Sequence, residues 1–286
     1  MTQSPSLDIL GFHLADLQQR LHIPTVSIST AMLGVALLSA TTLTAHASTL
    51  INATDYLQYE LPQEIQERCD ARQNCPDIEV QYLNSNHDWM NTLTNARIDE
   101  IVVNSKPTES APVSVDHKNS VKTALDEFAA SQFNDLPDDS VFVYSLMVKP
   151  SYLGHVDDYE LFEIDSYVFT GGAHGMPYSE YLIFDQNTKR QIQLEQILRY
   201  GVKARFKAVA YDAYTEWVKT VAEDPNRYEK SWPFTLSDDV TLTDKGINLR
   251  YQHYAISPYA YGMPVLSIPY DKLHGIIKPQ FFPISK

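Results

Sequence analysis

Three glycines and one histidine gather in a short run that offers the clearest candidate for chemistry. The run Gly-Gly-Ala-His-Gly at 171–175 follows a strand-like segment at 159–169. Glycines permit positive φ and let a backbone approach a ligand closely. A tight connection between strands, with the histidine bonded to backbone, would use the same residues. The ligand-contacting interpretation assigns the candidate contacts Gly171, Gly172, His174 and Gly175.

Tyrosines supply a second group of candidate contacts. Tyr251, Tyr254, Tyr259 and Tyr261 cluster around Pro258. Their rings could form a stacking surface for a sugar or a peptide, and packing at the edge of the core is the alternative use. Tyr178 follows the glycine run closely. We include Tyr178, Tyr254, Tyr259 and Tyr261 among the candidate ligand-binding residues.

Catalytic and metal-binding patterns are weak. The sequence contains no His-Glu-x-x-His, Gly-x-Ser-x-Gly or phosphate-binding glycine motif. Five residues, His155, Asp157, Asp158, Asp165 and His174, lie close in sequence, but their spacing matches no zinc or calcium loop. Glu160 and Glu163 with His174 could in principle carry out acid–base chemistry. We assign no catalytic residue, metal or cofactor, and a binding role is favoured over an enzyme.

The two cysteines of the chain, Cys69 and Cys75, stand six residues apart. In an exported chain, such a pair predicts a disulfide. A metal site is the alternative, although two cysteines without clustered histidines do not supply four ligands. The disulfide would clip the connection between a strand at 55–61 and another at 77–83.

The composition is that of an ordinary globular protein, with an acidic balance. Of 286 residues, 44% are hydrophobic, and the formal net charge is −14. A chain starting at Ser48 would carry about −13 by the same counting. Such a surface repels phosphate backbones and excludes nucleic acid as a natural partner, while it favours a basic protein. Acidity that serves only solubility is the simpler interpretation.

The first 47 residues predict export. No charged residue occurs between Arg20 and Asp55, and an apolar stretch ends in Ala-His-Ala at 45–47. This pattern is typical of a signal peptide cleaved before Ser48. An uncleaved signal anchor, crossing the membrane through 26–44, remains the alternative. We therefore expect a periplasmic or otherwise extracytoplasmic protein that is membrane-anchored only if cleavage fails.

The remaining pattern predicts an α+β fold. Helices are expected at 86–103, 115–133 and 202–222, with a short one at 194–198 and a last one at 269–277. Pro225 is expected to close the helix at 202–222. Further strands are expected at 141–148, 159–169, 178–184, 240–243, 247–251 and 265–268, with a loop at 105–115. Because hairpins outnumber βαβ units, we expect a mainly antiparallel sheet with helices packed on one face.

Several separated motifs then resemble a known family. They include the glycine run at 170–175, the segments at 232–251 and 254–263, the segment at 268–273, and the helix segment at 89–98. Together they resemble the domain shared by RsiV anti-sigma factors and the non-catalytic part of PdaC-type peptidoglycan deacetylases. The resemblance covers most of 56–279.

This resemblance implies an extracytoplasmic α+β domain and, in RsiV, recognition of lysozyme. It divides the chain into a leader at 1–47, a PdaC-like subdomain at 48–135 and an RsiV-like subdomain at 136–286. We expect a binding or sensing protein of the cell envelope. Its partner would be a basic protein such as lysozyme or a peptidoglycan fragment. The alternatives are an accessory protein of a peptidoglycan hydrolase or deacetylase, and a structural envelope protein without catalysis.

Overall fold

Residues 50–105 and 117–284 are described in the structure of the protein, which is a computed structural model. The predicted leader at 1–47 and nearly all of the predicted loop at 105–115 lie outside these residues. All described residues belong to one compact unit, Ser48–Lys286.

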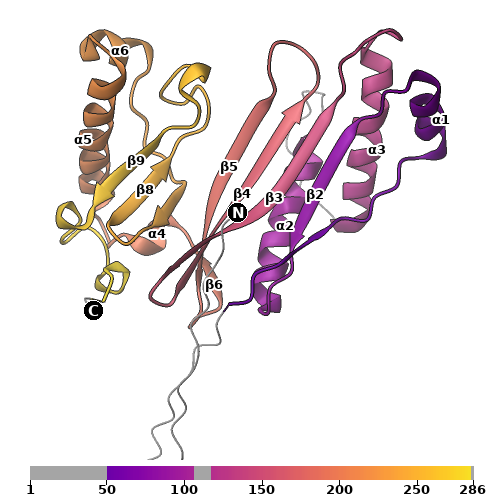
Figure 1. Ribbon diagram of the computed structural model, residues 1–286. Helices are drawn as coiled ribbons and strands as arrows, with labels where there is room; N and C mark the ends of the chain where they lie inside the picture. The colour runs from indigo at the N-terminus through magenta and orange to yellow at the C-terminus, as the bar shows by residue number, and fades with distance from the viewer. Residues whose placement is uncertain (1–49, 106–116, 285–286) are drawn as a thin grey trace, which may run out of the picture. The chain divides into compact units, whose positions relative to one another are not determined.

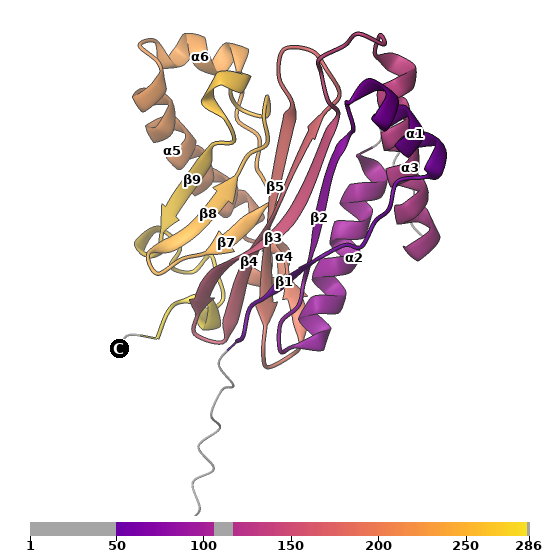
Figure 2. The ribbon, with the colours of Figure 1, turned by 45° about the vertical axis from the view of Figure 1, so that its right-hand side comes forward.

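Six strands form the larger sheet in the order β1-β2-β3-β4-β5-β6 (Figures 1 and 2). Neighbouring strands pair antiparallel, except that β2 and β3 pair parallel across the helical connection between them. The predicted α+β class and mainly antiparallel sheet are thereby confirmed. The strands are β1 Thr54–Tyr56, β2 Asp77–Leu83, β3 Ser145–Val156, β4 Tyr159–Phe169, β5 Met176–Asp185 and β6 Arg190–Ile192.

Two long helices cover one face of this sheet, as Figures 1 and 2 show from two sides. They are α2 (Asp88–Asn104) and α3 (His117–Asp135), and they lie side by side. Their buried side chains, among them Ile98 and Phe128, form one apolar cluster with Phe162 and Ile164 of β4. Burial of such a cluster is the main force that holds helices on a sheet.

The other face of β4 and β5 meets a second, smaller sheet. Leu161 and Ile183 point away from the two long helices and join an apolar cluster with the C-terminal part of the chain. This alternation follows from the period of two in a strand. The smaller sheet has the order β7-β8-β9, and α5 packs on β9. The elements are α4 Leu194–Ile197, α5 Lys203–Val221, α6 Pro225–Ser231, β7 Val240–Leu242, β8 Gly246–Arg250, η1 Tyr259–Tyr261, β9 Val265–Pro269, η2 Tyr270–Lys272 and η3 Pro279–Phe281.

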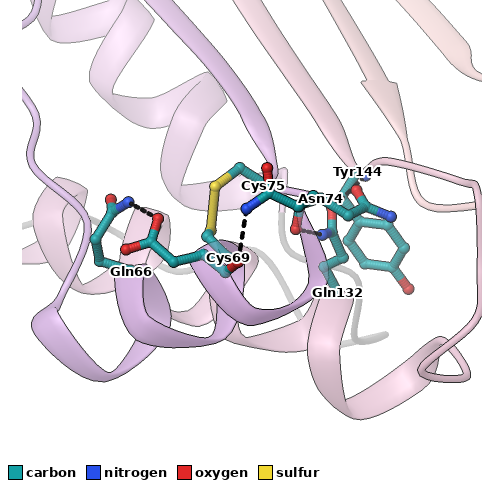
Figure 3. The surroundings of a disulfide bond; sticks show 8 residues. Gln66, Cys69, Asn74, Cys75, Gln132 and Tyr144 are labelled. Atoms are coloured by element: carbon teal, nitrogen blue, oxygen red, sulfur yellow. Dashed lines mark hydrogen bonds between the residues drawn. A yellow bond between two sulfur atoms is a disulfide. The ribbon is translucent and has the colours of Figure 1, made fainter.

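The predicted disulfide between Cys69 and Cys75 is present (Figure 3). The backbone N–H of Asn74 donates to the carbonyl of Cys69 at 3.3 Å inside the small ring that the disulfide closes. Gln132 of α3 holds this ring in place: its amide nitrogen donates to the Asn74 carbonyl at 3.3 Å, and its amide oxygen accepts from Tyr144 N–H at 2.7 Å. Gln132 is buried with both ends of its amide bonded, which avoids the cost of an unpaired polar group.

The disulfide lies between the two expected strands as predicted, but the connection that it clips differs from the expectation. The strand expected at 55–61 ends at Tyr56, and a helix, α1 (Gln63–Arg72), stands between it and β2. Residues 57–61 alternate because Leu57, Tyr59 and Leu61 pack against the core without a strand ladder. The helix escapes notice because its buried residues are only Ile65 and Cys69, so its apolar stripe is short.

Two further expectations need correction. The strand expected at 141–148 begins only at Ser145 and continues through Pro150 to Val156. Pairing with β2 ends at Val148, so at Pro150 β3 is an edge strand on that side, where proline is tolerated. Pro225 follows the end of α5 as expected, and it also begins α6. The helix expected at 269–277 is one 3-10 turn, because Gly275 adopts a φ of 72° that interrupts a helix.

Candidate functional site

The glycine loop joins β4 to β5 and presents its tip to solvent. Gly171 and Gly172 have φ values of 93° and 87°, which other residues rarely adopt. Gly172, Ala173 and His174 are exposed. The sequence therefore places glycines where the chain must turn sharply, and the turn carries His174 outward.

A stack of three rings forms beside this loop. The His174 ring lies on the Tyr259 ring with centroids 3.8 Å apart and planes at 18°. His253 stacks near the same tyrosine at 4.5 Å and 24°, and Tyr254 lies 5.9 Å from it. His253 and Tyr254 follow β8, and Tyr259 belongs to η1, so the stack joins segments about eighty residues apart. We call His174, His253, Tyr254 and Tyr259 the aromatic surface.

Gly175 is the point at which the loop and the aromatic surface meet. The Tyr259 hydroxyl donates to the Gly175 carbonyl at 2.9 Å. The Tyr167 ring of β4 lies directly over Gly175, where any Cβ would fall far inside contact distance of that ring. The φ of Gly175 is not positive, so its backbone conformation does not require glycine. Glycine is required because the Tyr167 ring approaches so closely.

Side chains in and next to β7 and β8 contact β5 beside the aromatic surface. Gln252 bonds both backbone groups of Ser179, at 2.6 Å to the carbonyl and 3.4 Å from the N–H. Asp239 accepts from Tyr181 N–H at 2.8 Å. Arg250 lies over the Tyr181 ring with its guanidinium carbon 3.8 Å from the centroid. These bonds satisfy strand-edge groups that would otherwise invite pairing with another chain.

Two titratable groups in this region are perturbed by burial. Burial lowers the pKa of His253, and repulsion from His174 lowers it further. The His253 Nδ1 atom is buried, and it has no hydrogen-bond partner among the described residues. Burial raises the pKa of Asp239 from 3.8 to about 6. In both cases burial disfavours the charged form of the side chain.

The structure does not bring all the predicted contacts together. His174 and Gly175 contact Tyr259, and the Tyr254 ring lies near the same tyrosine. Gly171 and Gly172 shape the turn of this loop, and a Cβ on Gly171 would meet Leu136. Tyr178 points to the face covered by α2, where its hydroxyl donates to Glu180 at 2.6 Å. Tyr261 turns to α5, with its hydroxyl donating to the Val221 carbonyl at 3.1 Å and its ring against Trp217.

Two members of the site were not among the predicted contacts. His253 stands next to a predicted tyrosine but was not itself selected, because a single histidine carries no spacing signal. Tyr167 lies eight residues before Gly175, on the strand that leads into the loop. The alternation of β4 puts Tyr167 on the face opposite the two long helices. This position in the alternation is the sequence signal that could have identified Tyr167 as part of the site.

The arrangement suits binding by half-exposed rings. In 50–105 and 117–284, no three His, Cys, Asp or Glu side chains are grouped so that they could hold a metal ion. Of the helices in these ranges, none is both long and apolar enough to cross a bilayer. The chemistry that the site offers is stacking on aromatic faces and hydrogen bonding by the loop.

Comparisons with known proteins identify a domain without an assigned function. Residues 183–271 match the family model described as "Protein of unknown function (DUF3298)". A comparison with the curated proteins finds no match. The fold is similar to the crystal structure of a DUF3298 family protein from Pseudomonas aeruginosa PAO1, with a TM-score of 0.59, 24% identity, and coverage of 82% of this chain and 96% of that one.

A DUF3298 family member from Bacteroides fragilis NCTC 9343 is similar as well. Its TM-score is 0.57 at 14% identity, over 81% of this chain and 95% of that one. Both likenesses concern the fold. The chain therefore contains a DUF3298 match that begins in β5 and ends in η2, within a fold that DUF3298 family proteins share.

Proposed function

We propose that the protein binds and senses a basic protein ligand in the cell envelope through the aromatic surface. Lysozyme is the ligand to test first. The observation that carries the proposal is the stack of His174 on Tyr259 at 3.8 Å, which fixes an exposed loop against a distant segment.

Rigidity supports a binding role for these rings. Tyr259 is held by two stacking contacts and by its hydrogen bond to Gly175, so little side-chain freedom remains to be lost on binding. Tyr254 is 48% exposed and can contact a partner directly. Rigid aromatic side chains with one wet edge are enriched at the centres of protein interfaces.

Charge supports a basic partner. The chain from Ser48 carries about −13, which would speed encounter with a cationic protein. Lysozyme itself enters through the resemblance of the sequence motifs to RsiV. The aromatic surface would then supply specificity, since long-range attraction alone does not distinguish one basic protein from another.

An extracytoplasmic location belongs to the same proposal. The Cys69–Cys75 disulfide supports it, because disulfides persist mainly in oxidising compartments. The apolar stretch that ends at 45–47 is the sequence signal for export.

The test is a calorimetric titration of the protein, purified from the envelope, with lysozyme at ~50 and ~300 mM salt, which shortens the screening length more than twofold. Specific recognition predicts saturable binding with a fixed stoichiometry at both concentrations. His174→Ala and Tyr259→Ala should each weaken binding by roughly tenfold or more, as truncation of a central interface residue does.

Tyr200→Ala is the matched control, because Tyr200 is fully exposed and lies outside the aromatic surface. It should bind like the wild type. Binding that disappears at ~300 mM salt, or that another basic protein of similar size reproduces, would reject specific recognition of lysozyme.

Peptidoglycan fragments are the second candidate, favoured by one observation: the exposed rings of His174 and Tyr254 could stack on sugar rings. Soluble muropeptides titrated under the same conditions distinguish the two. Saturable muropeptide binding that His174→Ala abolishes, without lysozyme binding, would select the glycan.

A further inference from the structure

The face of the larger sheet opposite α2 and α3 carries a row of side chains that the aromatic surface does not include. Strand register aligns Glu79 of β2 with Met147 of β3, then Tyr167 of β4 and Pro177 of β5. Their neighbours in sequence, Val80 and Val148 among them, point into the cluster beneath the two long helices. The row therefore faces the other way, and Met147 is 36% exposed.

A hollow of about 280 Å³ lies over this row. Its lining includes Glu79, Met147, Asp165, Tyr167, Pro177 and Met263. The floor is thus supplied by neighbouring strands, and Met263 adds a wall from the segment after η1. We call this feature the sheet-face hollow.

The sheet-face hollow is continuous with the aromatic surface. Tyr167, which lines the hollow, lies directly over Gly175, and Gly175 accepts the hydrogen bond from Tyr259. Met263 stands two residues after Tyr261, in the segment that carries the aromatic rings. One partner could therefore contact both features at once.

The charges at the hollow are mostly negative. Glu79 and Asp165 contribute carboxylates, and Lys149, which pairs with Asp165 across β3 and β4, contributes the single ammonium group of the lining. Asp77, exposed at the start of β2, adds a further carboxylate close by. Such a site favours a cationic occupant over an anionic one.

We infer that the sheet-face hollow docks an extended segment of the protein ligand in which lysines or arginines flank an apolar side chain. This inference rests on the proposed function. Two methionines give the hollow adaptable apolar walls, which suit such a side chain. The carboxylates face the flanking cations, and the neighbouring aromatic surface holds the rest of the partner.

Two opposite substitutions at Met147 test the inference. Met147→Lys and Met147→Glu both remove the apolar side chain but introduce opposite charges. Against lysozyme at ~150 mM salt, Met147→Lys should weaken binding by about tenfold or more, and Met147→Glu should bind at least ten times more tightly than Met147→Lys. The control is Met176→Lys, since Met176 is 47% exposed and points to the α2 face of the same sheet. This substitution should change the affinity for lysozyme by less than about twofold, since only the long-range charge of the new lysine acts. Equal affinities for Met147→Lys and Met176→Lys would overturn the inference.

A second probe separates this inference from the proposed function. A synthetic peptide of alternating lysine and leucine residues, titrated into the isotope-labelled protein, should shift the backbone amides of Met147 and Tyr167, and Met147→Lys should abolish the shifts. Lysozyme that fails to bind while the peptide shifts these amides would reject lysozyme and keep the hollow. A peptide that leaves both amides unmoved would reject the hollow, even if lysozyme binds.

Discussion

Asp239 joins the two sheets, and its replacement by asparagine should make the folded protein more stable at neutral pH. One carboxylate oxygen accepts from Tyr181 N–H at 2.8 Å, while the other is buried without a hydrogen-bond partner among the described residues. Asparagine has the same shape, and its oxygen can accept from Tyr181. Asp239→Asn therefore removes a buried charge and keeps the bond.

The magnitude follows from the pKa of Asp239, which burial raises from 3.8 to about 6. The folded protein then binds a proton more tightly than the unfolded chain. The stability that this tighter proton binding at Asp239 contributes is complete below pH ~3.8 and is lost as the pH rises through ~6. At about 1.4 kcal/mol for each pKa unit, the loss reaches roughly 3 kcal/mol at pH ~7.5. The advantage of Asp239→Asn should grow from about 0.5 kcal/mol at pH ~4 to about 3 kcal/mol at pH ~7.5.

Urea unfolding of wild type and variant at several pH values, followed by tryptophan fluorescence, measures this difference. Asp238→Asn is the control, because the neighbouring Asp238 side chain is 67% exposed. Its effect should stay within about 0.5 kcal/mol at every pH. An Asp239→Asn effect that does not depend on pH, or a loss of stability at pH ~7.5, would refute the reasoning.

Three further outcomes are expected. Replacing Cys69 and Cys75 by serine should reduce the free energy of unfolding by about 2 kcal/mol in the chain-entropy model, with a melting temperature lower by several degrees in calorimetry; an unchanged melting temperature would contradict this. Gly175→Ala should displace the Tyr167 ring, destabilise the protein by about 1–3 kcal/mol in urea unfolding and weaken lysozyme binding; a variant as stable as the wild type would show that the ring moves freely. N-terminal sequencing of the periplasmic fraction should find Ser48 first, whereas an intact start in the membrane fraction would indicate an anchor.

Elements with a strong period were predictable from the sequence. The strand expected at 159–169 coincides with β4, and the helix expected at 202–222 contains α5. Each element buries several apolar residues, so its hydrophobic period can be recognised in the sequence. By contrast, α1 buries only Ile65 and Cys69, which is too few to show a period.

Long-range pairing was not predictable in the same way. Alternation in β7, β8 and β9 identifies strands, but it does not say that they form a separate sheet or that β7 lies against β5. That docking depends on individual polar contacts, such as Asp239 with Tyr181 and Gln252 with Ser179. No sequence period encodes such contacts, because they join single residues far apart along the chain.

The candidate site shows the same division. Glycine content and exposed aromatic residues pointed to the loop at 171–175 and to Tyr254 and Tyr259. Side-chain direction decided the rest: Tyr178 turns towards α2, while Tyr167 turns to the face where Gly175 leaves room for its ring. Composition alone carries no information about such directions.

Hydrogen exchange of the full protein with and without lysozyme, read by mass spectrometry, tests the central claim most directly. Backbone amides within 170–176 and 252–263 should exchange more slowly in the complex, because bound protein would cover the loop and the segment that carries the aromatic rings. Peptides from α5 should exchange at the same rate in the free protein and in the complex. Protection confined to other elements, or no protection at lysozyme concentrations that saturate binding, would contradict recognition at the aromatic surface.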